Sequence, residues 1–407
     1  MSLKSLTPLI VIILGILPVY ASEQAINYKL YGFVRNDFYY NSRVNVQGSD
    51  GLFSIFPKPF ELNTLGEDIN SAPNAELLSI ATRLGLNFSG SSLLGAKSTA
   101  KIEFDFSGNS VNYYLIRIRQ AYMKLNWNKT ELLVGQTWHP MFGNVAPTIL
   151  SLNAGCPFQP FNRSPQIRLK QNISDKSYLT VAASYQMQYL SNGPLGKSAT
   201  YLKNAIAPDL FVGFESKTKH WTSGIGVETK TLKINHQKLR SASAELHTQY
   251  IAKKFKIKAK GLLGQNMSDY LMIGGYGVMG TDTNYNEDTY TNLNTLSSWL
   301  NIVYGSKLQA SIFAGISENL GTVSPLAPSN LGEFTTYGYG FYNTKQELLQ
   351  TLYRISGGLI YNISNFKLGI EYEFTNAIYG NINNKGLTDN PYNANNNRIT
   401  ASINFYF

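Results

Sequence analysis

The chain has 407 residues, is 13% aromatic and 15% charged, and carries a formal net charge of +10 at pH 7. Its one cysteine, Cys156, excludes an internal disulfide and a cysteine-rich metal site. The four histidines stand at positions 139, 220, 236 and 247, a spacing that fits no zinc site, so we expect no metal and no cofactor.

The first segment predicts a secretory signal peptide over residues 1–21. Lys4 makes its start positive, residues 9–17 form an apolar run, and Val19 and Ala21 occupy the cleavage positions. This run is shorter than the roughly 20 residues that a helix needs to cross a bilayer. We therefore expect an exported protein whose folded part is residues 22–407.

The rest of the chain shows apolar and polar residues alternating with a period of two, as in strands, where successive side chains face opposite sides. In the last ten residues, for example, apolar side chains occupy the odd positions from Ile399 to Phe407. One such face suits lipid and the other suits water. We predict about sixteen strands, near residues 27–43, 78–89, 97–107, 114–126, 131–138, 165–173, 178–190, 209–218, 221–231, 240–252, 255–267, 296–304, 308–317, 347–361, 366–376 and 397–407.

The joins between these strands alternate in length. The short joins are residues 90–96, 127–130, 174–177, 219–220, 253–254, 305–307 and 362–365, whereas most of the others are long: 44–77, 139–164, 191–208, 268–295, 318–346 and 377–396. A soluble β-sandwich has no reason to segregate its loops in this way. Outer-membrane barrels do so, with short periplasmic turns and long extracellular loops. The sequence therefore predicts an all-β fold, a transmembrane antiparallel β-barrel of about 16 strands.

The third long join, residues 139–164, differs in composition from the others. It contains four prolines and three phenylalanines but no aspartate or glutamate, and Arg163 is its only charged residue. Proline restricts the backbone and aromatic rings pack well, so this loop is predicted to adopt a fixed conformation. We identify it as a candidate constriction loop.

Motifs on both sides of this loop resemble those of trimeric Gram-negative porins, in particular the DcaP-like group. They are RQAY at 119–122, GQTW at 135–138 and PMFG at 140–143, together with YGFVRND at 31–37. The resemblance covers the first third of the chain, and the remainder resembles these porins only in strand rhythm and the terminal Phe407. It implies a homotrimer in the outer membrane, in contact with lipid, whose third loop folds into the lumen and sets the pore width. Two departures are the lack of an N-terminal coiled-coil extension and of the loop carboxylates of many cation-preferring porins.

Strand parity places many charged side chains on the faces that would line the lumen. Basic residues there modestly outnumber acidic ones, which predicts a weak preference for anions, because a narrow gap between low-dielectric walls concentrates the field. For any single residue, pairing with a neighbouring strand is an equally open interpretation. The candidate pore-lining residues are Arg35, Arg83, Lys101, Arg117, Arg119, Arg163, Arg168, Lys170, Asp37, Glu103 and Asp105, and further polar-face charges are Lys256, Lys258, Lys260, Arg354, Lys367, Arg398, Glu215, Glu228, Glu245, Glu371 and Glu373.

Arg117 and Arg119 conflict with this scheme. They share parity with Ala121 and Met123, so a regular strand would direct both arginines toward lipid. A β-bulge near Gln120 would return them to the lumen. Contact with a neighbouring subunit is the alternative, and the sequence leaves both open.

Three other features of the sequence resemble sites of chemistry. Residues 282–288 alternate oxygen ligands as calcium loops do, but Glu287 and Leu293 replace the required glycine and glutamate, which favours a solvated loop. His247 and Glu245 share a polar face, yet no Gly-x-Ser-x-Gly motif accompanies them. The basic residues form no surface stripe, so nucleic acid is not expected as a partner.

These observations predict an outer-membrane porin for passive diffusion of small hydrophilic solutes, with a weak preference for anions. We expect no catalytic residues and no enzyme activity. The alternative is a surface adhesin or structural outer-membrane barrel whose pore is incidental. A membrane-bound hydrolase is the third interpretation.

Overall fold

A computed structural model of the chain describes residues 26–48, 51–107 and 115–407. The predicted signal peptide lies outside the described residues. Within them, no helix is both long enough and apolar enough to cross a membrane.

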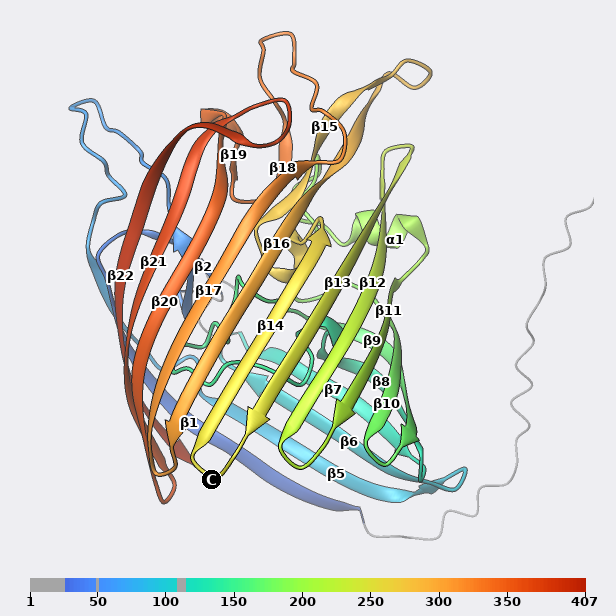
Figure 1. Cartoon of the computed structure of the whole chain (residues 1–407). Helices are drawn as coiled ribbons and strands as arrows, with labels where there is room; N and C mark the ends of the chain where they lie inside the picture. Colours follow the sequence, from blue (N-terminus) through green and yellow to red (C-terminus); the bar gives the residue numbers. More distant parts are fainter. Residues whose placement is uncertain (1–25, 49–50, 108–114) are drawn as a thin grey trace, which may run out of the picture.

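The described chain forms a closed antiparallel barrel of sixteen strands, which confirms the predicted fold class (Figure 1). The barrel closes where the first strand pairs with the last, with Phe33 opposite Tyr406 and Asn41 opposite Arg398. The second wall strand consists of two segments, β4 and β5, separated at residues 79–82. In chain order the wall strands are β1 (Asn27–Asn41), β4 (Asn74–Leu78) with β5 (Arg83–Leu93), β6 (Ala96–Asp105), β7 (Arg117–Asn126), β8 (Thr130–Trp138), β9 (Arg163–Ser174), β10 (Ser177–Ser184), β11 (Asp209–Lys217), β12 (Trp221–Ile234), β13 (Gln237–Ile251), β14 (Phe255–Gln265), β16 (Glu287–Gly305), β17 (Leu308–Thr322), β20 (Glu347–Ile363), β21 (Phe366–Ile382) and β22 (Thr388–Tyr406).

The side chains of the wall follow the predicted alternation. In β13 the polar residues Glu245 and His247 are buried, whereas Leu246 between them is 60% exposed. The apolar face of the strand therefore points outward and the polar face inward, the reverse of a soluble barrel. This orientation suits a wall surrounded by lipid.

The two rims differ as the sequence predicted. Short turns join the strands at one end of the barrel, and the long loops gather at the other (Figure 1). Some strands run far beyond their predicted ends: β16 begins at Glu287, because its first residues pair with a loop strand, β15. β10 instead stops at Ser184, short of the predicted residue 190. The elements formed by the long loops, none of them predicted, are β2 (Asn45–Gly48), β3 (Phe53–Pro57), η1 (Pro140–Phe142), α1 (Thr200–Ala205), η2 (Ser268–Tyr270), β15 (Gly274–Asp282), β18 (Thr336–Tyr339), β19 (Phe341–Tyr342) and η3 (Asn343–Lys345).

The hydrophobic core lies inside the barrel and is built largely by loops. Three segments fold inward: residues 51–57 of the first long loop, residues 139–162, which we call loop 3, and residues 266–273. Phe53, Phe158 and Leu271, one from each segment, belong to the same buried apolar cluster. Wall residues such as Trp299 and Phe313 complete the cluster. These segments therefore fill much of the lumen beside β16 and β17, the strands that carry Trp299 and Phe313. The sequence predicted an inward path for the 139–164 segment only.

Candidate functional site: the lumen beside loop 3

Loop 3 reaches across the lumen to the opposite wall. Its first turn accepts hydrogen bonds from Lys260 Nζ, at 3.1 Å to the Met141 carbonyl oxygen and 2.5 Å to that of Phe142. Further along, the Glu371 carboxylate accepts the backbone N–H groups of Leu150 and Ser151 at 2.7 and 3.2 Å. The loop then returns to the wall at β9, which begins at Arg163, so the predicted boundary at residue 164 is two residues too far.

Arg354 on β20 holds two of the inward segments together. Its guanidinium donates to the carbonyl oxygen of Cys156 at 2.8 Å and to that of Ile55 at 2.7 Å. Its Nε lies 3.3 Å from the Glu373 carboxylate, and Arg354 is fully buried. Parity assigned Arg354, Lys260 and Glu371 to the lumen face, but these charges contact the backbone of loops instead of solute.

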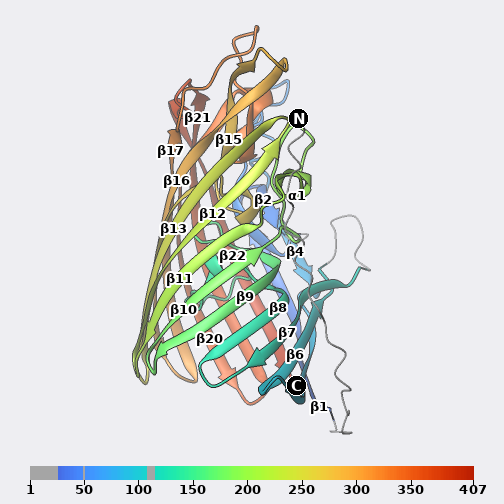
Figure 2. The ribbon, with the colours of Figure 1, turned by 90° about the vertical axis from the view of Figure 1, so that its right-hand side faces the viewer.

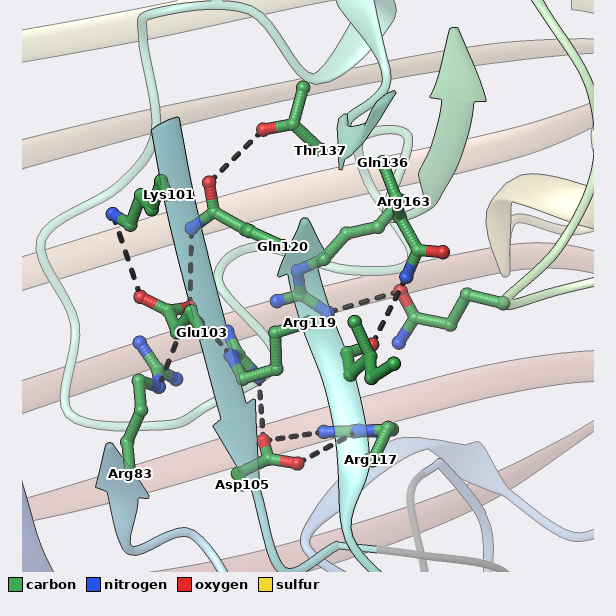
Figure 3. Close-up of polar contacts among 12 residues, drawn as sticks. Arg83, Lys101, Glu103, Asp105, Arg117, Arg119, Gln120, Gln136, Thr137 and Arg163 are labelled. Carbon is green, nitrogen blue, oxygen red and sulfur yellow. Dashed lines mark hydrogen bonds and ion pairs between the residues drawn. The ribbon is translucent and has the colours of Figure 1, made fainter. Parts of the chain in front are cut away.

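The arginines that conflicted with strand parity lie inside the barrel. The register between β6 and β7 shifts where Glu103 faces Gln120 and Phe104 faces Ile118, so Arg119 is the extra residue of a β-bulge. Its guanidinium forms ion pairs with Glu103 at 2.9 Å and Asp105 at 2.8 Å (Figure 3). Arg117 also pairs with Asp105, at 2.8 Å. The bulge turns both arginines inward, which is the first of the two alternatives that the sequence left open.

These arginines border a cavity of about 200 Å³ between the wall and loop 3, which we call the upper cavity. Its acidic neighbours are fewer than its cations. Asp105 forms ion pairs with both Arg117 and Arg119, and Asp37 forms an ion pair with Arg35 at 2.7 Å. The charged residues that line the cavity are Arg35, Arg83, Asp105, Arg117, Arg119 and Arg163.

Arg163 is the least compensated of these cations. It is 1% exposed, and within the described part of the chain its guanidinium donates one hydrogen bond, to the Gln188 amide oxygen at 3.0 Å. Its guanidinium carbon lies 3.7 Å from the centre of the Trp138 ring, a cation–π contact. Among the described residues, Arg163 Nε and Nη2 have no hydrogen-bond partner and no carboxylate pairs with the group. The upper cavity therefore carries an excess of positive charge.

A second cavity, of about 280 Å³, lies closer to the short turns, and we call it the lower cavity. Arg168 and Lys170 of β9 border one side, and the Lys170 ammonium sits 3.5 Å from the centre of the Tyr178 ring. Glu215, Glu245 and His247 border another side. The imidazole bridges the two carboxylates, with Nε2 at 3.1 Å from Glu215 and Nδ1 at 3.0 Å from Glu245. Both ring nitrogens thus contact carboxylates, an arrangement unlike a histidine paired with a nucleophilic serine.

Trp138 lines both cavities and separates them. Its ring stacks on Phe142 of loop 3 with centroids 4.1 Å apart and planes 11° apart. The strand positions of the lining residues give the order of the cavities along the barrel. Arg83 is the first residue of β5, at the end far from the short turn, whereas Tyr178 follows a short turn directly. The upper cavity therefore lies nearer the long loops and the lower cavity nearer the short turns, and Trp138 lines both.

The structure distributes the predicted site residues between these places. Arg35, Arg83, Asp105, Arg117, Arg119 and Arg163 line the upper cavity, and Arg168 and Lys170 line the lower one. Lys101 and Glu103 lie beside the upper cavity and form an ion pair at 3.7 Å. Asp37 is buried against Arg35.

Sequence reasoning missed several residues of the lumen. Lys230 shares the parity of Glu228 and could have been assigned to the polar face on that ground. It pairs with Asp269 and donates to the Asn266 carbonyl oxygen at 2.8 Å, so it anchors the 266–273 segment. No sequence signal shows that Asp269, inside a long loop, returns to the wall.

The comparisons with known proteins bear on the fold. No family model and no curated protein matches the sequence. Among solved structures, the outer membrane channel DcaP of Acinetobacter baumannii is similar, with a TM-score of 0.71 and 18% identity over 95% of this chain and 99% of that one. An anion-selective porin from Comamonas acidovorans has a TM-score of 0.54 and 9% identity over 94% of this chain and 100% of that one.

A trimer form of OmpT, an outer membrane protein of Vibrio cholerae, has a TM-score of 0.54 and 9% identity, with 94% of this chain and 100% of that one covered. Similarity at such identities concerns the path of the chain and not the identity of a solute. It extends over nearly the whole barrel, beyond the first third in which sequence motifs were found. The chain has the fold of the outer-membrane porins, and in this it is similar to the DcaP channel, as its sequence motifs predicted.

Proposed function

We propose that this chain is a DcaP-like porin of a Gram-negative outer membrane that acts as a homotrimer. Small hydrophilic solutes diffuse passively through its lumen, and loop 3 sets the narrowest part. The channel prefers anions weakly. The protein performs no enzymatic reaction and needs no cofactor.

One observation carries this proposal: two cavities lie in the lumen beside loop 3, and five arginines but one carboxylate line the upper one. Arg163, Arg168 and Lys170 form no ion pair among the described residues. Uncompensated charge beside a narrow polar gap raises the local concentration of counter-ions. The similarity to a channel, to an anion-selective porin and to a trimeric barrel supports the same proposal.

The preference for anions is expected to be mild. Glu103 and Asp105 pair with Arg117 and Arg119, so two carboxylates offset two arginines. In the lower cavity, the carboxylates of Glu131, Glu215 and Glu245 equal in number the cations of Lys124, Arg168 and Lys170. The net excess of positive charge is therefore smaller than the number of lumen arginines suggests.

Planar-bilayer recordings test both parts of the proposal. In a potassium chloride gradient, the reversal potential should favour chloride, and the preference should shrink at high salt because the Debye length falls from about 10 Å at 0.1 M to about 3 Å at 1 M. Liposome swelling with neutral and charged solutes of graded size should show a sharp size limit. A cation preference would contradict the charge assignment, and absence of flux from a correctly inserted trimer would favour the structural barrel.

A further inference from the structure

The lower cavity presents charges of both signs to one small space. Arg168 and Lys170 stand on β9, and neither forms an ion pair among the described residues. Glu245 and Glu215 border the same cavity from β13 and β11. Lys124 and Glu131 also line it and pair with each other at 3.1 Å, so their charges offset one another. The cavity of about 280 Å³ has the size of a small ligand site.

The carboxylates of Glu215 and Glu245 differ in the number of hydrogen-bond donors that they contact. Glu215 accepts hydrogen bonds from the Tyr178 hydroxyl, from Asn144 Nδ2 at 3.0 Å and from His247 Nε2 at 3.1 Å. Among the residues that the structure describes, the Glu245 carboxylate has one hydrogen-bond partner, His247 Nδ1, at 3.1 and 3.0 Å from its two oxygens. A carboxylate has about four acceptor positions. Glu245 therefore keeps the capacity to accept a further hydrogen bond from a cation in the cavity.

We propose that the lower cavity is a binding site for a small dipolar solute that carries one carboxylate and one ammonium group, such as an amino acid. The carboxylate lies against Arg168 and Lys170, and the ammonium group lies toward Glu245. The inference rests on the proposed channel function in one respect, since the solute must reach the lumen.

Other classes of solute fit the cavity less well. A dianion would place its second negative charge toward Glu215 and Glu245, which like-charge repulsion disfavours. A simple cation would meet Arg168 and Lys170. A guanidinium binds a carboxylate through parallel N–H bonds, so Arg168 is suited to orient the acid end of the solute.

Single-channel recordings of the full-length protein at low salt test this proposal with three solutes of equal carbon chain. Occupancy of the site is read as interruption of the ionic current. We expect γ-aminobutyrate to interrupt the current at concentrations about tenfold lower than butyrate or butylammonium, because it alone forms charge-assisted contacts with both walls. Equal potency of γ-aminobutyrate and butyrate would overturn the proposal.

Two substitutions separate the roles of the two walls. Arg168→Gln should raise, by about tenfold, the concentrations at which γ-aminobutyrate and butyrate interrupt the current. Glu245→Gln should weaken the binding of γ-aminobutyrate, whereas the binding of butyrate should be unchanged or tighter. Lys219→Gln, which removes one charge from an exposed short turn, is the matched control and should change neither. Unchanged γ-aminobutyrate potency in Glu245→Gln would show that Glu245 does not bind the ammonium group of the solute.

A different readout keeps this test independent of the proposed function. If the protein conducts no current, the channel function fails, and calorimetry of γ-aminobutyrate with the detergent-solubilised protein decides the site. If Glu245→Gln does not fold, as judged by heat-dependent gel mobility, Lys170→Gln tests the cationic wall. The comparison of solutes on the unmodified protein remains in every case, and equal affinity for γ-aminobutyrate and butyrate overturns the site.

Discussion

The two sides of the barrel use the same kind of lumen charge for different purposes. On β14, β20 and β21, the side chains of Lys260, Arg354 and Glu371 bind backbone groups of the inward loops. On β5, β7 and β9, residues such as Arg83, Arg119 and Arg168 line cavities. Figure 2 shows the β6–β10 wall, whose strands are short beside the long β16. Lumen-facing charge on the first side therefore attaches loops, whereas on the second side much of it lines cavities.

Removing part of loop 3 is expected to have the largest effect, because this loop separates the two sides. Deletion of residues 145–158 should widen the lumen, raise the single-channel conductance severalfold and admit larger solutes. Shortening the tip of the β15–β16 hairpin, at residues 283–286, is the matched control and should leave conductance unchanged. Unchanged conductance in a correctly inserted deletion variant would place loop 3 outside the path of ions.

Substituting an anchor charge should act on stability and loop order more than on selectivity. Arg354→Gln removes the donors to Cys156 and Ile55 and leaves the buried Glu373 carboxylate without its ion-pair partner. Breaking a buried ion pair from one side costs about 3 kcal/mol, so heat-dependent gel mobility should change at a lower temperature. Open-channel current noise should rise as the loops loosen.

A double variant checks the cause of that effect. Arg354→Gln with Glu373→Gln removes both charges and should recover part of the thermal stability, since no unpaired charge remains. The noise should persist, because the loop carbonyl oxygens still lack the guanidinium. Quiet recordings from both variants would show that Arg354 does not hold the loops.

Inverting charges on the cavity side should shift selectivity more than stability, although Arg83 loses its ion pair with Glu103 at 3.8 Å. Arg83→Glu combined with Arg168→Glu should move the reversal potential toward potassium, because the changed charges face water in the upper and lower cavities. Lys307→Glu, at an exposed short turn on the other side, is a matched control for a single inversion. An equal shift in the control would mean that total charge, not its place in the lumen, sets selectivity.

The smallest effect concerns pH and the first long loop. Burial raises the pKa of Asp68, but hydrogen bonds from the backbone N–H of Glu61 and from Arg43 outweigh it, and the net pKa lies below the usual value. A lowered pKa contributes stability that is full above the ordinary value of about 4 and is lost as pH falls through the folded-state pKa. Proteolysis of this loop should therefore accelerate only in acid.

Asp68→Asn provides the comparison for this prediction. The amide cannot form the ion pair with Arg43, so the variant should show fast proteolysis already at neutral pH and little further change in acid. The same acid acceleration in the variant and in the unmodified protein would assign the effect to another group. Conductance should change little, because the contact lies in a loop and not beside the two cavities.

Much of the fold follows from the alternating pattern alone. A strand in a barrel has only two faces, so parity decides which side chains meet lipid and which enter the lumen, and loop lengths decide the rims. All sixteen wall strands lie at or near their predicted positions. Even the bulge at Arg119 could be anticipated, because arginines on the lipid side would be costly, although the choice between a bulge and a subunit contact needed the structure.

What the tertiary structure alone decided is which lumen charges reach water. Arg354 and Arg168 are both arginines on the polar faces of wall strands, yet Arg354 is buried under two loops and Arg168 borders a cavity. A period of two records the face of a strand and contains no information about where a distant loop will pack. Loop 3 was recognisable by its prolines and phenylalanines, but the inward paths of residues 51–57 and 266–273 arise from contacts with residues far away in the sequence. Because of those long-range contacts, some lumen charges are covered by loops and others line cavities.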